Sequence, residues 1–196
     1  MKIGLLFGSF NPVHVGHLII ANFFREFTDI DQVWFVVSPQ SPFKIDDKLA
    51  AEEDRAEMLR LALSGTEGYR VCDIELNLPR PSYTYRTLQA LRQQFPDYEF
   101  VLIMGGDNLV SFHKWKQADW IAHEFDIYVY PRPGYNADYV SFPRLRIVHA
   151  PLLEISATFI RKAIAEGKHP WFFLHPQVAE YIKRKGLYGY KPVSRR

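Results

Sequence analysis

The sequence has little cysteine, no long apolar run and almost no excess of charge. Cys72 is the single cysteine among 196 residues, which excludes a disulfide scaffold and a zinc site built from several cysteines. No apolar run approaches the ~20 residues that cross a bilayer, and the first residues show no cleavable signal pattern. We therefore expect a cytoplasmic protein without a membrane partner.

The charge balance gives no sign of a polyanionic partner. Lysine and arginine number 24, aspartate and glutamate number 22, and the formal net charge is +2. The basic residues are unevenly placed, and those from Lys183 to Arg196 have few acidic neighbours. We interpret this segment as a solvated helix end followed by a frayed tail. No nucleic acid is expected as a partner.

The overall composition is that of a globular domain. Hydrophobic residues make up 47% of the chain and charged residues 23%, as in ordinary folded proteins. A chain of this length fits one domain. We expect that domain to occupy residues 1–188 and the basic tail to occupy residues 189–196.

Short apolar runs alternate with amphipathic stretches along the chain. This alternation predicts an α/β fold, Rossmann-like and doubly wound, with a mostly parallel sheet and helices on both faces. The expected strands are 2–7, 33–37, 70–76, 100–104, 127–130 and 145–148. The expected helices are 15–27, 51–64, 83–94, 156–167 and 177–186, with one or two short helices within 107–124. We expect Ser82 to cap the helix at 83–94.

The stretch GSFNPVHVGH, from Gly8 to His17, follows an expected strand and opens an expected helix. Open α/β sheets bind ligands at that edge, and a helix start offers unpaired N–H groups that suit an anion. His14 and His17 are three residues apart, so they share one face of a helical turn. Gly8 permits close approach of the backbone, and Gly16 leaves room for a bulky ligand. The pattern favours a phosphate site.

Two other interpretations stay open for the histidine pair. It could be a surface coincidence, or it could be half of a zinc site. Zinc would need a further ligand, and no second histidine pair or cysteine stands ready. The stretch matches neither the P-loop pattern nor the glycine pattern of dinucleotide-binding folds.

A second helix start lies in the run ISATFIRK, from Ile155 to Lys162. Ser156 is placed to cap the helix, and Thr158 follows inside its first turn. Arg161 lies in the second turn, on the side that is reached from the N-terminus. Alone, the run is typical of an ordinary capped helix. Beside the first stretch, it favours a site for a polyphosphate.

Both stretches resemble the signatures of the nucleotidylyltransferase superfamily, G-x-F-x-P-x-H-x-G-H and I-S-x-T-x-I-R. The resemblance implies that His14 and His17 hold triphosphate oxygens and that Ser156 and Arg161 close over the phosphates from the opposite side. Many members carry threonine and aspartate where this chain has Ser9 and Asn11. Serine keeps the hydroxyl group, whereas asparagine removes a carboxylate.

Four more stretches are similar to bacterial nicotinate mononucleotide adenylyltransferases: PSYTYRTL (81–88), GGDNLVSFHKW (105–115), RPGY (132–135) and the ending KGLY (185–188). The resemblance implies transfer of AMP from ATP to nicotinate mononucleotide, with Mg²⁺ bound through the ATP phosphates. Adenylyl transfer to nicotinamide mononucleotide or phosphopantetheine stays open, as does a non-catalytic nucleotide-binding protein. A homo-oligomer is also open.

The resemblance assigns further roles. Trp115 would offer an aromatic face to the cationic ring, although a core position is the alternative. Backbone N–H groups at Thr84 and Lys116 would hold the ring carboxylate. From its place after an expected buried strand, Asp107 would bind ribose hydroxyls or orient the substrate, or it would only cap a helix. The candidate catalytic residues are His14, His17 and Arg161. The candidate ATP-binding residues are Gly8, Ser9, Phe10, Gly16, Gly105, Asp107, Ser156 and Thr158. The candidate residues for nicotinate mononucleotide are Gln40, Lys44, Thr84, Trp115, Lys116 and Arg132, and no metal-ligating side chain is expected.

Overall fold

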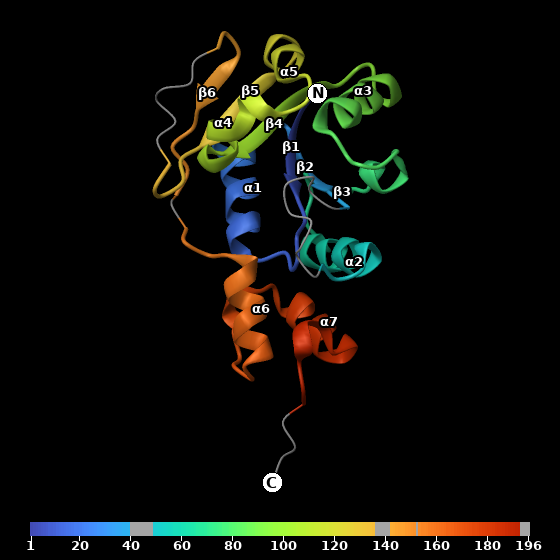
Figure 1. Ribbon diagram of the computed structural model, residues 1–196, viewed down its shortest axis with the longest axis vertical. Helices are drawn as coiled ribbons and strands as arrows, with labels where there is room; N and C mark the ends of the chain where they lie inside the picture. The colour runs from blue at the N-terminus through green and yellow to red at the C-terminus, as the bar shows by residue number, and fades with distance from the viewer. Residues whose placement is uncertain (40–48, 136–141, 152, 193–196) are drawn as a thin grey trace.

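The computed structural model describes residues 1–39, 49–135, 142–151 and 153–192. Within these ranges six strands form one parallel sheet in the order β3-β2-β1-β4-β5-β6 (Figure 1). They are β1 (Lys2–Gly8), β2 (Gln32–Val37), β3 (Tyr69–Cys72), β4 (Glu99–Gly105), β5 (Asp126–Tyr130) and β6 (Leu145–Ile147). This is the strand order of a doubly wound fold, so the predicted α/β architecture is confirmed.

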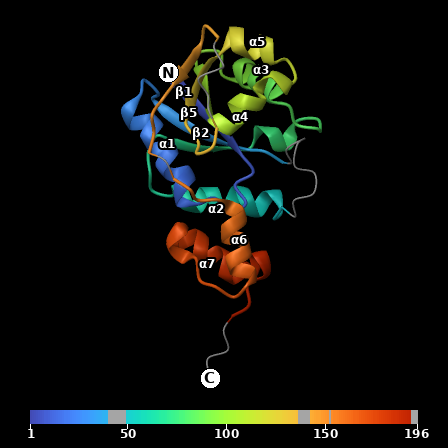
Figure 2. The ribbon, with the colours of Figure 1, turned by 60° about the vertical axis from the view of Figure 1, so that its left-hand side comes forward.

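Helices cover both faces of the sheet (Figure 2). Helices α1 and α2 pack on one face, and α3, α4 and α5 pack on the other. The α-helices are α1 (Val15–Phe27), α2 (Glu52–Leu63), α3 (Thr84–Gln94), α4 (Gly106–Ser111), α5 (Ala118–Glu124), α6 (Ala157–Ala165) and α7 (Pro176–Lys185). The 3-10 helices are η1 (Ile74–Asn77), η2 (Phe112–Lys114), η3 (Trp171–Phe173) and η4 (Leu187–Gly189).

The central strands are apolar throughout because both of their faces are covered. In β1, Ile3 and Leu5 belong to the core under α3, and Leu6 belongs to the core under α1 and α2. All three side chains are at most 4% exposed. Strands buried on two faces read as continuous apolar runs rather than alternating ones, which explains why these strands could be predicted.

Two local predictions before α3 were wrong. The strand expected at 70–76 ends at Cys72, and η1 follows it. The chain turns there because Glu75 lies inside the protein, 2% exposed, and accepts a hydrogen bond of 2.6 Å from Thr87. Ser82 does not cap α3, whose N-cap is Tyr83. The Ser82 hydroxyl faces the Glu75 carboxyl group instead.

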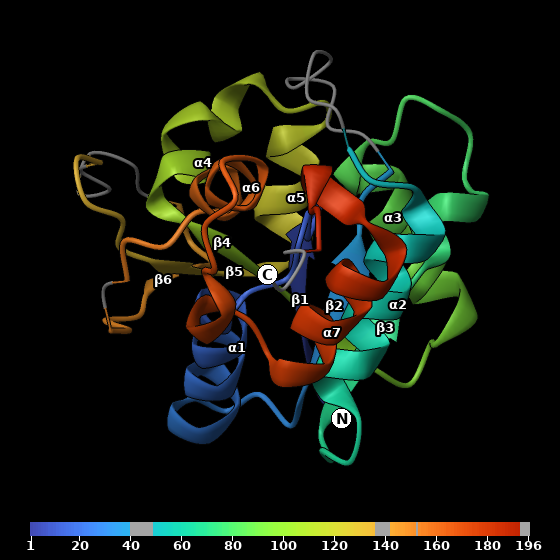
Figure 3. The same cartoon turned by 90° about the horizontal axis from the view of Figure 1, so that it is seen from below.

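The last two α-helices, α6 and α7, lie beyond the carboxyl end of β1 (Figures 1 and 3). The Tyr181 hydroxyl of α7 donates to the Asp54 carboxylate of α2 over 2.7 Å. Tyr190, inside the segment expected as a tail, packs its ring on Trp171 with centroids 5.7 Å apart. No helix within the described ranges is long and apolar enough to cross a membrane.

Candidate active site

The site lies where the strand order reverses. Strand β1 is central, with β2 on one side and β4 on the other, and ligands of doubly wound folds bind outside the carboxyl ends of such strands. After Gly8 the chain passes through Phe10, whose φ of 45° is unusual for an L residue. A Cβ at Gly8 would stand 2.9 Å from the Phe10 ring. The ring is 1% exposed and supports His17 edge-on, with centroids 5.1 Å apart.

The two histidines stand together as predicted. His14 is the N-cap of α1 and His17 is its third residue, and their rings stack with centroids 3.8 Å apart. The His14 backbone N–H donates to Nδ1 of His17 over 3.3 Å. Since Nδ1 accepts this bond, a neutral His17 ring carries its proton on Nε2 and can donate from there. A Cβ at Gly16 would stand 3.0 Å from the His14 ring. Glycine at this position therefore lets the imidazole pack closely against the first turn of α1.

Both rings are neutral in the free protein at neutral pH. Desolvation, with the positive charge of Arg132 second, lowers the pKa of His14 to about 4. Desolvation and the nearby His14 and Arg132 hold the pKa of His17 well below its usual value. A bound anion acts in the opposite direction, because it favours the charged imidazole. The pair is therefore matched to a ligand that brings negative charge.

This burial predicts that acid destabilises the protein. Between pH 6.5 and 4 the unfolded chain binds a proton at His14 that the folded chain does not, so stability falls as the pH is lowered. The shift corresponds to a loss of about 2 kcal/mol between pH 7 and pH 5, since one pKa unit is worth about 1.4 kcal/mol. Urea unfolding at the two pH values measures this loss together with the contribution of His17, whose pKa is lowered in the same direction, and a variant of His14 separates the two.

The matched control is His14→Gln, which cannot take the proton and should lose less stability over the same interval. Burial raises the pKa of Glu75 and stabilises the folded protein toward acid, but this acts equally in both proteins. The pKa of Asp29, lowered to about 2, affects stability only below its usual range near pH 4. Equal losses in wild type and variant would contradict the assignment to His14.

The carboxylate of Asp107, after β4, and the guanidinium of Arg132, after β5, lie next to each other. Nε of Arg132 lies 3.6 Å from Oδ1 of Asp107, and both side chains are more than one third exposed. These two atoms are themselves buried and have no hydrogen-bond partner among the described residues, so the exposed remainder of each side chain is the part that a ligand can reach. A Cβ at Gly105 would overlap with this Asp107 oxygen and press on Arg132. A side chain at position 105 would therefore shift the Asp107 and Arg132 side chains from this arrangement.

The histidines, Arg132 and the chain before α6 line one cleft that is partly open to solvent. His14, Gly16 and His17 form one wall, and the segment from Tyr130 to Pro133 forms another. Pro151, Leu153 and Ile155 supply the third side. The predicted residues of α1 and Arg132 are thus brought together, although Ser156, Thr158 and Arg161 stand beside the cleft rather than in its lining.

The start of α6 stands directly against the start of α1. A Cβ at Gly16 would lie 3.7 Å from that of Ile155. The next residue, Ser156, is the N-cap of α6, as predicted, and its hydroxyl accepts the Phe159 N–H over 3.2 Å. Arg161 donates to the Asn11 carbonyl over 2.9 Å and to the Thr158 hydroxyl over 3.3 Å. Three of its five N–H groups are then left for a ligand.

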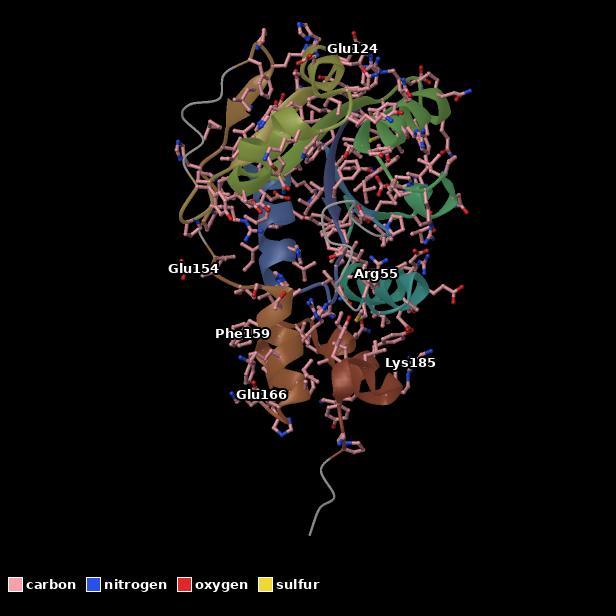
Figure 4. The ribbon with its side chains drawn as sticks, in the orientation of Figure 1. Arg55, Glu124, Glu154, Phe159, Glu166 and Lys185 are labelled. Atoms are coloured by element: carbon pink, nitrogen blue, oxygen red, sulfur yellow. The ribbon has the colours of Figure 1, made fainter. Side chains whose placement is uncertain are left out.

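Sequence reasoning missed the structural role of two residues that hold this region together, Asn11 and Arg55. Asn11 is 1% exposed, and its Oδ1 accepts bonds from the Ala50 N–H over 3.0 Å and from the Tyr188 hydroxyl over 2.9 Å. An aspartate is therefore not needed at position 11 for these two contacts, because the single side-chain oxygen of asparagine accepts both hydrogen bonds. Arg55, labelled in Figure 4, is fully buried and donates to the carbonyls of Ser9, Ser38, Pro39 and Ala50.

A second group of predicted residues gathers at the start of α3. Thr84 and Tyr85 occupy the first two helical positions, whose N–H groups have no acceptor within a helix. Nζ of Lys116 lies 4.9 Å from the ring centroid of Tyr83, the residue before Thr84. Trp115 is half-buried and packs on Phe112 with centroids 5.4 Å apart. Thr84, Trp115 and Lys116 thus meet in one neighbourhood, apart from the histidine cleft.

Two predicted residues, Gln40 and Lys44, lie outside the described residues. Within the described part of the chain, no group of three or more histidine, cysteine, aspartate or glutamate side chains could hold a metal ion. The Asp107 carboxylate lies next to Arg132, which lines the cleft. A divalent ion that enters with phosphates fits this arrangement, because Mg²⁺ is commonly held by one or two carboxylates together with substrate phosphates.

The chain is similar in sequence to known proteins. Residues 5–163 match the family model described as "Cytidylyltransferase-like". Proteins named "Probable nicotinate-nucleotide adenylyltransferase" from Flavobacterium johnsoniae and Cytophaga hutchinsonii are each 47% identical, over 96% of this chain and 99% of their own.

The solved structures agree in fold. The Plasmodium falciparum nicotinic acid mononucleotide adenylyltransferase complexed with NaAD superimposes with a TM-score of 0.79 at 18% identity, covering 97% of this chain and 98% of its own. A Vibrio parahaemolyticus structure titled as the same kind of enzyme gives 0.72 at 22% identity, covering 95% of this chain and 94% of its own. By its identity to the bacterial relatives, this chain belongs to the nicotinate-nucleotide adenylyltransferase family.

Proposed function

We propose that this chain transfers the adenylyl group of ATP to nicotinate mononucleotide. This is the activity for which its relatives are named. The products are deamido-NAD and pyrophosphate. The observation that carries the proposal is the meeting of two helix starts, those of α1 and α6, beside a stacked histidine pair and Arg161. Helix starts, imidazole N–H groups and a guanidinium are the donors that a triphosphate needs.

The reaction needs positioning more than proton transfer. The phosphate of nicotinate mononucleotide is already an anion at pH 7, and one of its oxygens attacks the α-phosphorus of ATP. The new P–O bond forms as the bond from the α-phosphorus to its bridging oxygen breaks, and pyrophosphate leaves with that oxygen. The protein's part is to align two anions and to stabilise the charge that develops on the pyrophosphate.

The residues around α1 and α6 are assigned to the triphosphate. His17 donates from Nε2, and His14 donates from its neighbouring ring. Ser156 and Thr158 each accept one hydrogen bond within the protein, so their O–H groups remain free to donate to phosphate oxygens. Arg161 donates one hydrogen bond to the Asn11 carbonyl and offers its remaining N–H groups to the phosphates. Arg132 and Asp107 are assigned to a substrate phosphate and to ribose hydroxyls.

The residues around the start of α3 are assigned to the nicotinate ring. Trp115 offers an aromatic face to a cationic ring. The free N–H groups of the first α3 turn and the Lys116 backbone suit the ring carboxylate, and the positive end of the helix adds to them. Gln40 and Lys44 remain assigned to the same substrate. Mg²⁺ is proposed to enter with the ATP phosphates, and the cytoplasm is the proposed compartment.

Turnover with a panel of acceptors tests the proposal. Pyrophosphate release from ATP is measured with nicotinate mononucleotide, nicotinamide mononucleotide and phosphopantetheine in turn. We expect the largest kcat/KM with nicotinate mononucleotide. No release with any acceptor would favour a non-catalytic nucleotide-binding protein, and a preference for phosphopantetheine would reassign the substrate while leaving adenylyl transfer intact.

Replacing Arg161 by lysine should lower activity. Lysine keeps the charge but loses the planar guanidinium. It cannot donate to the Asn11 carbonyl and to two phosphate oxygens at the same time with the geometry of arginine. Hydrogen bonds to charged groups contribute roughly 1.5–3 kcal/mol, so kcat/KM should fall about tenfold or more, with a higher KM for ATP. Arg60→Lys, at an exposed arginine of α2, is the control. If R161K changes only the thermal midpoint, the residue has a structural role.

A further inference from the structure

The two halves of the proposed phosphate site come from different parts of the fold. The histidines sit on α1, directly after the central strand. Ser156, Thr158 and Arg161 belong to α6, which stands with α7 beyond the carboxyl end of the sheet (Figures 1 and 3). Donors that act on one triphosphate must keep a fixed separation. Something must therefore hold α6 against the loop between β1 and α1.

Asn11 is the point where the two parts are joined. Its carbonyl oxygen accepts from Arg161 over 2.9 Å. Its side-chain oxygen accepts from Tyr188 over 2.9 Å and from the Ala50 N–H over 3.0 Å. Because a backbone N–H can only donate, the Ala50 contact fixes which end of the amide is the oxygen. Tyr188 therefore donates its proton to Asn11 rather than accepting one.

Tyr188 is held in this place by its surroundings. It lies in η4 with a φ of 57°, a left-handed conformation that is unfavourable for a residue with a side chain. Its ring packs against the core that also contains α6 and α7. Burial raises the pKa of its hydroxyl, and the positive charges of Arg161 and Arg55 oppose that rise. The hydroxyl thus stays protonated as a donor, close to both guanidinium groups.

We propose that Tyr188 is a positioning residue for the phosphate site. By donating to Asn11 it fixes the β1–α1 loop against the C-terminal helices, and it thereby sets the carbonyl on which Arg161 rests. This inference rests on the proposed role of Arg161 toward the triphosphate. It adds a residue from the end of the chain that touches neither substrate nor reacting atoms.

The chain supplies a matched control in Tyr181. Both tyrosines belong to the C-terminal region and pack in the same core. Each donates one hydrogen bond to a side-chain oxygen of a distant residue, Tyr188 to Asn11 and Tyr181 to Asp54 over 2.7 Å. Tyr181→Phe loses a bond that does not reach Arg161. A purely structural role of Tyr188 would make the two phenylalanine variants behave alike.

The experiment compares wild type, Tyr188→Phe and Tyr181→Phe by ATP kinetics and by calorimetric titration with pyrophosphate. One neutral hydrogen bond corresponds to a factor of about three to ten. We expect Tyr188→Phe to raise the KM for ATP and weaken pyrophosphate binding by that factor. Tyr181→Phe should lower the thermal midpoint while leaving both quantities unchanged.

A second background separates this inference from the function itself. In Arg161→Ala, adding Tyr188→Phe should weaken pyrophosphate binding no further, because the group that it positions is gone. Wild-type affinity and KM in Tyr188→Phe, an equal effect in Tyr181→Phe, or an undiminished effect in the Arg161→Ala background would each overturn the inference. Pyrophosphate binding does not depend on which mononucleotide is the acceptor, so a failed substrate assignment leaves this measurement decisive.

Discussion

Replacing His17 by alanine should reduce adenylyl transfer by at least ~10²-fold while the protein stays folded. The ring stands at the start of α1, and its Nδ1 is already engaged by the His14 N–H. Its free Nε2–H is the donor assigned to the departing pyrophosphate. A donor aimed at developing charge stabilises the transition state more than the bound substrate, so the loss should fall mainly on kcat. Steady-state kinetics with saturating Mg²⁺ and ATP measure it.

Two further variants separate catalysis from helix capping. His17→Asn keeps a short polar group that can accept the His14 N–H, but it cannot reach the position of Nε2. His17→Gln reaches farther and can place an N–H near that position. We expect the asparagine variant to keep the thermal midpoint and lose activity, and the glutamine variant to recover part of the activity. Near wild-type turnover in His17→Ala would remove the histidine from the mechanism.

The fold could be predicted because its signals are local and repeated. Strands β1 and β4 are short apolar runs that end in glycines, and the helices between strands carry apolar faces. The prediction failed between Arg70 and Ser82, where the alternation of apolar and polar residues resembles a strand. The burial of Glu75 against Thr87, twelve residues away, decides the local structure there. A contact of that range leaves no pattern in the neighbouring residues.

The places of the proposed donor groups were also predictable, because these residues sit at helix starts and in compact motifs. The residues that hold those groups in place were not. Tyr188 meets Asn11 across 177 positions, and only the folded chain brings the two together. Arg55 left a weaker signal. It precedes Met58 and Leu59 by three and four residues, which places its charge on the buried face of α2.

Selectivity for the acid over the amide should be the other large effect. The ring substituent is assigned to the N–H groups at the start of α3 and at Lys116. A carboxylate accepts at both oxygens, whereas a carboxamide would turn its own NH₂ toward one donor. A buried donor left unpaired costs roughly 1–3 kcal/mol, and the lost charge adds to this at the positive end of the helix. We therefore expect kcat/KM to favour nicotinate mononucleotide over nicotinamide mononucleotide by at least ~10²-fold.

Thr84 allows the responsible donor to be removed on its own. It is the first residue of α3, a position where proline is tolerated, and Tyr83 before it is already extended with φ −121° and ψ 130°. Thr84→Pro deletes one backbone N–H and keeps the helix, whereas Thr84→Ala keeps the N–H and loses only the side chain. The acid preference should fall about tenfold or more in the proline variant and stay near wild type in the alanine variant and in Lys116→Ala. A preference that survives Thr84→Pro but collapses in Lys116→Ala would assign selectivity to the lysine charge, and comparable kcat/KM for both mononucleotides in the wild type would reject acid specificity altogether.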